Sequence, residues 1–357
     1  MTPQLEEFRN LTRPPWGWTA DHRRQRIGII GATGAVGREL LSLLHAAGHG
    51  AERVECAARA RTEVVLANGA RFAVRELASL DTQSWDVAFL CTPSEVSRAL
   101  ARPLAQTGVR VIDLSSEHRM HPDVPLVIPE INGRELEGDV RLIANPNCTT
   151  AVAALPLAVL DRAAELEEVH VVSFQAASGV GASGLVTLAH ELAHHAHDAA
   201  LSAPASPFPA PLLLNVIPAV ATVDAHGVSG EERKIMNELA RILSRPGLPV
   251  EATTTRVAVE RCHCVAVHAR FVRDLDVDEA REHLRAAPGI VVSDDPHGPR
   301  PRECAGSDPV HVGRIRAGTR RKRSLCFFAV GDQLRKGAAL NALQIAACLP
   351  ATPSPRS

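Results

Sequence analysis

Cys148 is the residue of this chain with the clearest chemical potential. It lies in Ala144-Asn-Pro-Asn-Cys-Thr-Thr150, where Asn-Pro-Asn is typical of a turn and Thr149 to Leu160 favour a helix as far as Pro156. A thiol in a first helical turn faces unpaired N–H groups and the positive end of the helix dipole, which stabilise its thiolate. Since a thiolate can attack a carbonyl carbon, the sequence predicts a covalent catalyst, with a half-buried packing residue as the alternative.

A glycine-rich turn is the second chemical feature. Gly31-Ala-Thr-Gly34-Ala-Val-Gly37 follows an apolar run, 26–30, and precedes helical spacing. Gly31 permits a tight turn, Gly34 lets a pyrophosphate approach the backbone, and Gly37 allows close packing of helix on strand. The context predicts a dinucleotide site. Its residues are Gly31, Thr33, Gly34, Ala35, Val36 and Gly37.

The residues after the second predicted strand, 54–58, indicate which dinucleotide binds. The acidic residue that usually binds the ribose is not clearly present there, and the chain has Arg59 and Arg61 instead. Arginine can neutralise a 2′-phosphate, so the sequence favours NADP over NAD. The alternative is that both arginines belong to an ordinary surface loop.

A zinc-protease pattern, H-E-x-x-H, occurs at His190-Glu-Leu-Ala-His194 on a predicted helix. Two histidines at i and i+4 can bind zinc, with Glu191 as general base. The chain holds 16 histidines, so a five-residue match arises easily by chance, and no third ligand follows at a defensible spacing. We therefore expect no metal site.

The elements that must position these groups fall into two sets. Strands alternating with helices over the first 150 residues indicate a Rossmann-type, doubly wound parallel sheet, and the longer strands after Cys148 indicate a second α+β domain. The predicted domains are a poorly ordered extension (1–25), an NADP-binding domain (26–147), a catalytic and dimerisation domain (148–333), a helix returning to the first domain (334–349) and a tail (350–357).

Composition excludes several classes of protein. The 357 residues carry a net charge of −1, which argues against general affinity for nucleic acid or acidic membranes. No stretch reaches the roughly 20 apolar residues that span a bilayer, and residues 1–26 contain no apolar segment of a secretory signal. The eight cysteines are scattered, so we expect a reduced, cytoplasmic protein.

Several runs, in order from about residue 26 to 349, together resemble the aspartate-β-semialdehyde dehydrogenase family. They are Gly31–Gly37, Arg119-Met-His-Pro-Asp-Val-Pro-Leu126, Asn145–Thr150, Gln175-Ala-Ala-Ser-Gly179, Asn215-Val-Ile-Pro218, Glu231-Glu-Arg-Lys234, Arg256 with His263, Val312-Gly-Arg-Ile315 and Gly331–Asn341. The resemblance implies reversible, NADPH-dependent reduction of L-aspartyl-4-phosphate to aspartate semialdehyde and phosphate through a cysteine thioester, on the pathway to lysine, methionine, threonine and isoleucine. It also implies a homodimer, with a homotetramer left open.

The resemblance also implies a role for each matching residue. Cys148 would be the nucleophile, His263 the general acid and base, and Gln175 the residue that positions the thioester. Substrate contacts would come from Arg256 to the carboxylate, Glu231 to the ammonium group, and Arg119 and Lys234 to the phosphate. Ser178, Gly179 and Asn341 would lie beside the cofactor.

The chain departs from the family pattern in two of the runs quoted above. The family's Gly-His-Ser is Cys262-His263-Cys264 here, and its Gly-Asp-Asn is Gly331-Asp-Gln333. Alternate strand residues face opposite sides, so His263 should point away from both cysteines, which argues against a metal there. The alternatives left open are an enzyme resembling N-acetyl-γ-glutamyl-phosphate reductase and a dinucleotide-binding paralogue with little activity.

Overall fold

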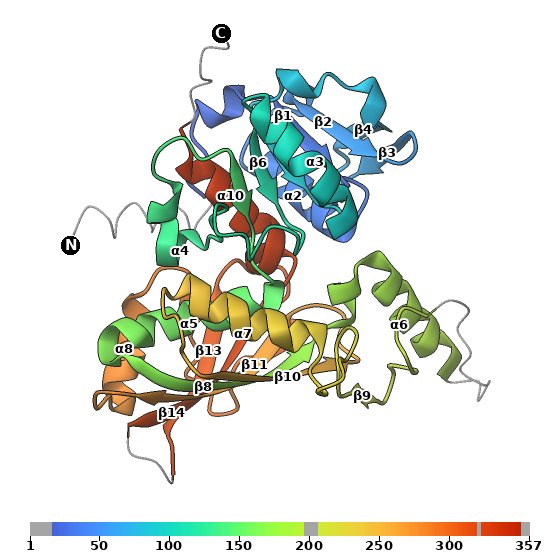
Figure 1. The fold of residues 1–357 in the computed structure, drawn as a ribbon. Helices are drawn as coiled ribbons and strands as arrows, with labels where there is room; N and C mark the ends of the chain where they lie inside the picture. Colours follow the sequence, from blue (N-terminus) through green and yellow to red (C-terminus); the bar gives the residue numbers. More distant parts are fainter. Residues whose placement is uncertain (1–15, 196–205, 320–322, 351–357) are drawn as a thin grey trace. The chain divides into compact units, whose positions relative to one another are not determined.

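The computed structural model describes residues 16–195, 206–319 and 323–350. The chain forms two compact units (Figure 1): one contains residues 1–146 and 338–357, and the other contains residues 147–337. The last segment of the chain therefore belongs to the first unit, while the predicted helix 334–349 begins in the second.

The first unit is built on a seven-stranded sheet in the order β3-β4-β2-β1-β5-β6-β7. All neighbours are parallel except β3 and β4, which form an antiparallel hairpin. The strands are β1 (Ile27–Ile30), β2 (Val54–Ala58), β3 (Thr62–Val65), β4 (Arg71–Glu76), β5 (Val87–Leu90), β6 (Arg110–Asp113) and β7 (Leu142–Ala144). The helices are α2 (Ala35–Ala46), α3 (Ser94–Gln106), α4 (Pro129–Asn132) and α10 (Leu340–Cys348).

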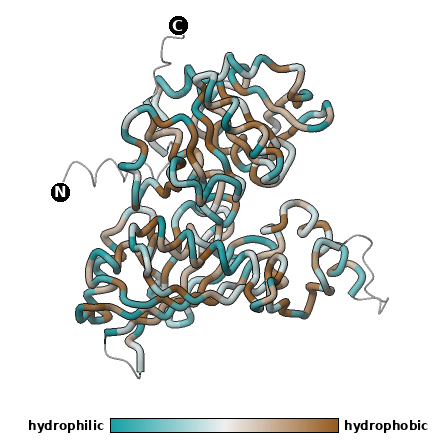
Figure 2. The backbone as a smooth tube through the Cα atoms, in the orientation of Figure 1, coloured by the Kyte–Doolittle hydropathy of each residue, from teal (hydrophilic) through white to brown (hydrophobic). Residues whose placement is uncertain are grey.

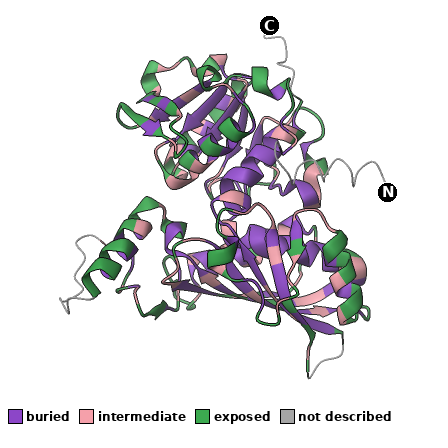
Figure 3. Ribbon diagram, turned by 180° about the vertical axis from the view of Figure 1, so that it is seen from behind, coloured by how far each residue is buried: buried purple, intermediate pink, exposed green. Residues whose placement is uncertain are grey.

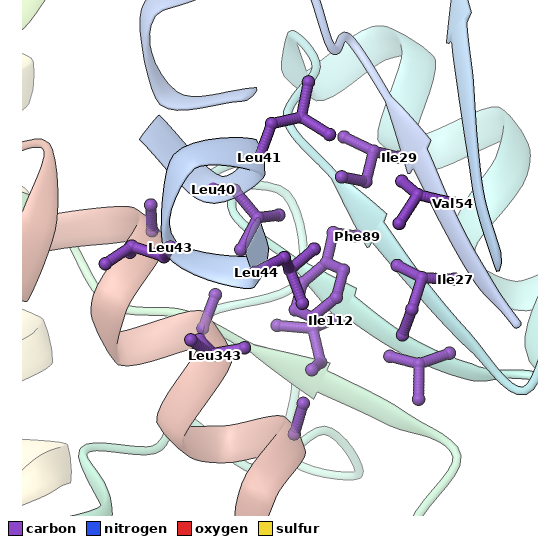
Figure 4. Packing of buried hydrophobic residues seen from close by; sticks show 14 of the residues in the cluster. Ile27, Ile29, Leu40, Leu41, Leu43, Leu44, Val54, Phe89, Ile112 and Leu343 are labelled. Atoms are coloured by element: carbon purple, nitrogen blue, oxygen red, sulfur yellow. The ribbon is translucent and has the colours of Figure 1, made fainter. Parts of the chain in front are cut away.

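The core of this unit lies between the sheet and the helices α2 and α10. The central strands β1 and β5 are apolar throughout and fully buried, and Figure 2 shows the hydropathy of each segment. In Figure 4, Leu343 of α10 lies close to Leu43 and Leu44 of α2, and Leu44 lies beside Phe89 of β5. A helix from the end of the chain thus completes a core that the first strands begin.

The N-terminal extension differs from the prediction. Residues 1–15 lie outside the described residues. Residues 16–25 are described, and buried side chains among them pack in the core of the first unit. The prediction of a poorly ordered extension is therefore wrong for residues 16–25. Trp16 and Trp18 are buried in the core, and Trp18 Nε1–H donates to Nδ1 of His49 (3.3 Å). Burying two indole rings provides several kcal/mol of hydrophobic stabilisation, which explains why this segment is ordered.

The second unit also has a seven-stranded sheet, in the order β12-β13-β14-β11-β8-β10-β9, with mixed parallel and antiparallel neighbours. Its strands are β8 (Leu166–Gln175), β9 (Val216–Ile217), β10 (Val250–Val257), β11 (His263–Phe271), β12 (Ile290–Val292), β13 (Val310–Ala317) and β14 (Ser324–Gly331). Its helices are α5 (Cys148–Ala164), α6 (Ala182–His195), α7 (Gly230–Ile242), α8 (Val277–Ala286) and α9 (Pro301–Cys304), and a π-helical turn spans Arg335–Ala339, across the boundary between the units.

Helices α5, α7 and α8 cover one face of this second sheet, and Figure 3 shows that much of the sheet is buried. Helix α6 is largely exposed. Helix α5 continues through Pro156 to Ala164, beyond the point where the sequence predicted a disturbance. The two sheets with their helices confirm the predicted combination of a Rossmann-type domain and a second α+β domain. Among the described residues, no helix has the length and apolar character needed to cross a membrane.

Candidate active site

Cys148 is the first residue of α5, where the sequence placed it. Asn147 caps this helix: its side-chain oxygen accepts from the N–H groups of Thr149 (2.9 Å) and Thr150 (3.0 Å). The cap fixes the first turn and keeps the positive end of the helix dipole beside the thiol. Cys148 is only partly buried. Gly337 lies directly behind it, because a Cβ there would come within 2.9 Å of the Cys148 Cβ.

Glu231 is the acceptor that ties this helix start to three other groups. Its Oε1 accepts from Nδ2 of Asn147 (2.7 Å) and Nε2 of Gln175 (3.4 Å), and its Oε2 accepts from Nζ of Lys234 (3.1 Å). Burial by itself would raise the pKa of Glu231, but Lys234 and the Asn147 hydrogen bond outweigh burial and lower that pKa. Glu231 is therefore an ionised carboxylate in a buried site.

Two residues of this network were missed by the sequence reasoning. The sequence predicts Asn147 only as part of a turn, but its side chain links the helix of Cys148 to Glu231. Glu238 is buried and accepts from the Asn147 N–H (2.6 Å). Glu238 follows Glu231 by two helical turns on α7, so both lie on one face, and this spacing was a usable signal.

Arg256 and His263 meet at the end of strand β8. Nη1 of Arg256 donates to the carbonyl of Ala176 (2.6 Å), and the N–H of Ala176 donates to Nδ1 of His263 (3.1 Å). Gly179 lies against both side chains, since a Cβ there would come within 2.4 Å of Arg256 Nη1 and 3.1 Å of His263 Nε2. Gly179 therefore leaves the space that these two groups face.

The electrostatics of Arg256 and His263 follow from their burial. Burial, followed by the charge of Arg256, lowers the pKa of His263 to about 3, although Glu231 acts in the opposite direction. Burial also lowers the pKa of Arg256, while Cys148 and Glu231 oppose that change. His263 is thus neutral at pH 7, and because Nδ1 accepts a hydrogen bond, its proton is assigned to Nε2. That N–H is buried and has no hydrogen-bond partner among the described residues.

Eight of the predicted residues thus belong to the second unit, and contacts join most of them into one cluster. They are Cys148, Gln175, Ser178, Gly179, Glu231, Lys234, Arg256 and His263. His263 packs away from the two cysteines that flank it, because Cys262 and Cys264 lie in a separate cluster with Cys304. Among the described residues, no group of three or more His, Cys, Asp or Glu side chains is placed so that it could hold a metal ion.

In the first unit, the glycine-rich turn has the conformation that a dinucleotide site requires. Gly31 has φ +87°, and a Cβ on Gly37 would come within 2.5 Å of the Gly31 carbonyl oxygen. Gly34 precedes α2, with no side chain capping the helix. The N–H groups of Ala35, Val36 and Gly37 therefore have no acceptor among the described residues and are available to a phosphate.

The end of strand β2 carries cations and no available acid. Arg59 and Arg61 are both exposed, and neither has an ion pair with another described residue. Glu55, within β2, accepts a hydrogen bond from Nε1 of Trp85 (2.6 Å). The one carboxylate of this strand is therefore engaged in holding a tryptophan.

Arg119 and Asn341 also lie in the first unit and are buried. Nε of Arg119 donates to the carbonyl of Asn145 (2.8 Å), and Nδ2 of Asn341 donates to Oδ1 of Asn145 (2.8 Å) and to the carbonyl of Val127 (2.9 Å). Both therefore fix the segment that leads to Cys148. Their contacts with phosphate and cofactor stay predictions.

The zinc-protease pattern has a structural explanation. Glu191 is buried and accepts hydrogen bonds from the N–H groups of Leu212 (3.0 Å) and Leu213 (2.7 Å), so it anchors a loop instead of activating water. The rings of His190 and His194 stack on the exposed side of α6, 3.9 Å apart.

Comparisons with known proteins agree with this site. Residues 26–138 match the family model described as semialdehyde dehydrogenase, NAD binding domain. Residues 157–336 match the one described as semialdehyde dehydrogenase, dimerisation domain. The two matches point to one class of oxidoreductase, which acts on an aldehyde and binds a nicotinamide dinucleotide.

The similar proteins narrow that class. Aspartate-semialdehyde dehydrogenase of Streptomyces akiyoshiensis is 37% identical over 334 residues, which is 90% of this chain and 97% of the relative. The enzyme of the same name from Campylobacter jejuni is 36% identical over 333 residues, 91% and 97% of the two chains. A crystal structure of aspartate semialdehyde dehydrogenase II complexed with ASA from Vibrio cholerae has a TM-score of 0.86 and 30% identity, covering 91% and 97%. The chain belongs to the aspartate-semialdehyde dehydrogenase family, as its motifs predicted.

Proposed function

We propose that this chain catalyses the reversible, NADPH-dependent reduction of L-aspartyl-4-phosphate to aspartate semialdehyde and phosphate. The observation that carries this proposal is the position of Cys148: it begins a capped helix whose cap, Asn147, bonds to a buried Glu231. Around it lie the amide, guanidinium and imidazole groups that an acyl-transfer site needs. The names of the relatives support the choice of substrate.

The cofactor proposal rests on the first unit. The unbonded N–H groups at the start of α2 suit a pyrophosphate, and the exposed Arg59 and Arg61 suit a 2′-phosphate, so we propose NADP over NAD. Thr33 and the glycines of the turn complete this site, with Asn341 as a further proposed contact in the same unit. When bound, the dinucleotide donates or accepts the hydride of the reaction.

In the proposed mechanism, the Cys148 thiolate attacks the acyl carbon of aspartyl phosphate. A carbon–sulfur bond forms, the bond from that carbon to the phosphate oxygen breaks, and phosphate leaves, with Lys234 as its proposed partner in the second unit. The helix dipole of α5 favours the thiolate before attack. After reduction, the carbon–sulfur bond breaks, which returns the thiolate and releases the aldehyde.

His263 acts in this mechanism at the oxygen of the reacting carbonyl. Its neutral ring presents Nε2–H beside Gly179, where it can donate to that oxygen. Proton transfer from the ring requires a higher pKa than the free protein provides. A substrate carboxylate paired with Arg256 would cancel part of the charge that lowers this pKa, so binding prepares His263 to act as general acid and base.

Glu231 favours this substrate over N-acetyl-γ-glutamyl phosphate. It is a buried, ionised carboxylate next to Cys148's helix, which suits an ammonium group, whereas an acylated nitrogen carries no charge. Gln175, which bonds to Glu231, would position the thioester.

The test is NADPH formation by the purified protein with aspartate semialdehyde, with and without phosphate. Phosphate-dependent turnover that is absent with N-acetylglutamate semialdehyde supports the proposal. Binding of NADP without turnover on either aldehyde would contradict it and favour the inactive paralogue.

We propose a homodimer formed through the second unit, with a homotetramer as the further state to test. The match to a dimerisation domain supports this, as does Val172, an exposed apolar residue of β8, an interior strand of the sheet. Sedimentation equilibrium separates the two states. We also propose a cytoplasmic location, because the clustered thiols of Cys262, Cys264 and Cys304 form no disulfide.

A further inference from the structure

Gln333 joins two backbone segments that are far apart in the sequence. It is buried just after strand β14, and its Oε1 accepts from the N–H of Cys262 (2.7 Å). Its Nε2 donates to Oγ of Ser178, whose hydroxyl in turn donates to the carbonyl of Glu260. One amide therefore uses both its acceptor and its donor to connect the 260–262 turn with the short helical turn at Ala177–Val180.

These two segments are the ones that hold the imidazole of His263. His263 directly follows Cys262, so the backbone at 262 sets where strand β11 and this side chain begin. On the other side, the N–H of Ala176 holds Nδ1, and Gly179 faces Nε2. A shift between the two segments would therefore change the direction in which Nε2–H points.

Cys262 has an unfavourable backbone conformation, which the hydrogen bond to Gln333 helps to maintain. Its φ is +75°, in the left-handed region that residues with a Cβ rarely adopt. Its side chain is buried against Cys264 and Cys304, so it cannot relax by turning outward. The hydrogen bond from its N–H to Gln333 is thus one of the contacts that keep this turn in place.

We propose that Gln333 and Cys262 form a coupled positioning pair that fixes the orientation of His263 for the reaction. This inference rests on the proposed function, in which His263 acts at the reacting oxygen. An amide is needed because the site requires an acceptor for one segment and a donor for the other. The length of glutamine is needed as well, because asparagine, one methylene shorter, cannot span both contacts while Cys262 stays where it is.

The experiment is a double-mutant cycle with Gln333→Asn, Cys262→Gly and the double variant. We expect Gln333→Asn to lower kcat by about 10-fold with little change in KM for aspartate semialdehyde, and to shift the pH profile of kcat. Glycine at position 262 lets the backbone there move closer to the shorter side chain of Asn at position 333. The double variant should therefore recover most of the lost kcat. Gln344→Asn is the matched control, because Gln344 is equally buried but bonds to Glu130 in the first unit.

Three results would overturn the inference. They are additive effects of the two substitutions, a wild-type kcat and pH profile in Gln333→Asn, and an equal loss of kcat in Gln344→Asn. Failure of the proposed function is seen separately, as a wild-type protein without turnover. In that case the NMR signals of His263 test the pair: a shift in Gln333→Asn that returns in the double variant supports it, and unchanged signals overturn it.

Discussion

The glycine-rich turn of the first unit and the Cys148 cluster of the second are built in opposite ways. The turn is seven consecutive residues, Gly31–Gly37, and it offers mainly backbone N–H groups and space. The cluster takes side chains from α5, β8, α7, β10 and β11. A site made of backbone groups needs the space that an added Cβ would occupy. A site made of side chains needs the chemistry of each group. Substitutions should therefore fail for different reasons in the two regions.

The largest effect is expected at the side-chain site. Cys148→Ala removes the nucleophile, so phosphate-dependent NADPH formation should fall at least about 1,000-fold, while NADP binding by the first unit persists. Cys326→Ala, at another partly buried cysteine, is the control and should keep wild-type activity. Full turnover in Cys148→Ala would remove the covalent mechanism.

Next in size is the carboxylate that organises the cluster. Glu231→Gln places an amide where Asn147 and Lys234 both donate, so kcat/KM for aspartate semialdehyde should fall about 10- to 100-fold. Steady-state kinetics measure this. Glu232→Gln changes the neighbouring capping-box residue and should lower stability more than activity. Equal kinetic losses in both variants would show that the effect comes from folding.

The backbone site should respond to added methyl groups instead. Gly37→Ala forces a Cβ to within 2.5 Å of the Gly31 oxygen and 2.7 Å of the Ala32 Cα, so it should lower the free energy of unfolding by about 1–3 kcal/mol. Gly34→Ala meets only an atom at 3.4 Å and should fold normally. Its NADP affinity, measured by titration calorimetry, should nevertheless fall, since its Cβ would occupy the pyrophosphate's place. Unchanged affinity would place the cofactor elsewhere.

The preference between NADP and NAD tests a side-chain contribution to the backbone-based site. Arg61→Ala removes a side-chain charge from an otherwise backbone-based site, so the preference for NADP over NAD should fall about 10-fold. Arg59→Ala tests the second cation, and Arg75→Ala, at an exposed arginine of β4, is the control. Ratios of kcat/KM for the two cofactors decide the matter, and unchanged ratios in both variants would assign the arginines to a surface loop.

The last prediction concerns how the free energy of unfolding depends on pH. The folded protein lowers the pKa of His263 from 6.5 to about 3, so folding disfavours the protonated ring. This histidine's contribution to stability is therefore complete above about pH 6.5 and is lost as pH falls toward 3. Between pH 7 and pH 4, urea unfolding should show that the free energy of unfolding falls less steeply in His263→Asn than in the wild-type protein. His226→Asn, at an exposed histidine, should keep the wild-type slope.

The sequence predicted those parts of the site whose signal is local. The glycine turn, the helix after it and the position of Cys148 each depend on a few neighbouring residues, and the structure shows them as expected. The hairpin of β3 and β4 had a local signal that was not used: Asn68-Gly69 forms its turn, with Gly69 at φ +85°. Trp16 and Trp18 were a second local signal: in a chain with few aromatic residues, two tryptophans indicate that the extension packs in the core.

Other features had no local signal. The bond from Cys262 to Gln333 joins residues that only the pairing of β11 with β14 brings together, and nothing near Cys262 predicts its left-handed backbone. The same holds for Asn147 and Glu238, whose contact depends on how α7 packs against α5. Contacts of this kind follow from tertiary structure, so the order of the motifs identified Cys148, Glu231 and His263 but not the residues that hold them in place.

The return of α10 to the first unit has a consequence for how the protein is made. Residues of the second unit end at Gly337, so a ribosome delivers that unit complete before Leu343 and Ile345 emerge to close the first unit's core. Two hydrogen bonds also form only after the end of the chain is made: Nη1 of Arg110 donates to the carbonyl of Pro350 (2.8 Å), and Nε2 of His22 bonds to the carbonyl of Leu349 (3.3 Å). The first unit therefore lacks part of its core until the last helix has been synthesised, and its apolar sheet must stay soluble until then.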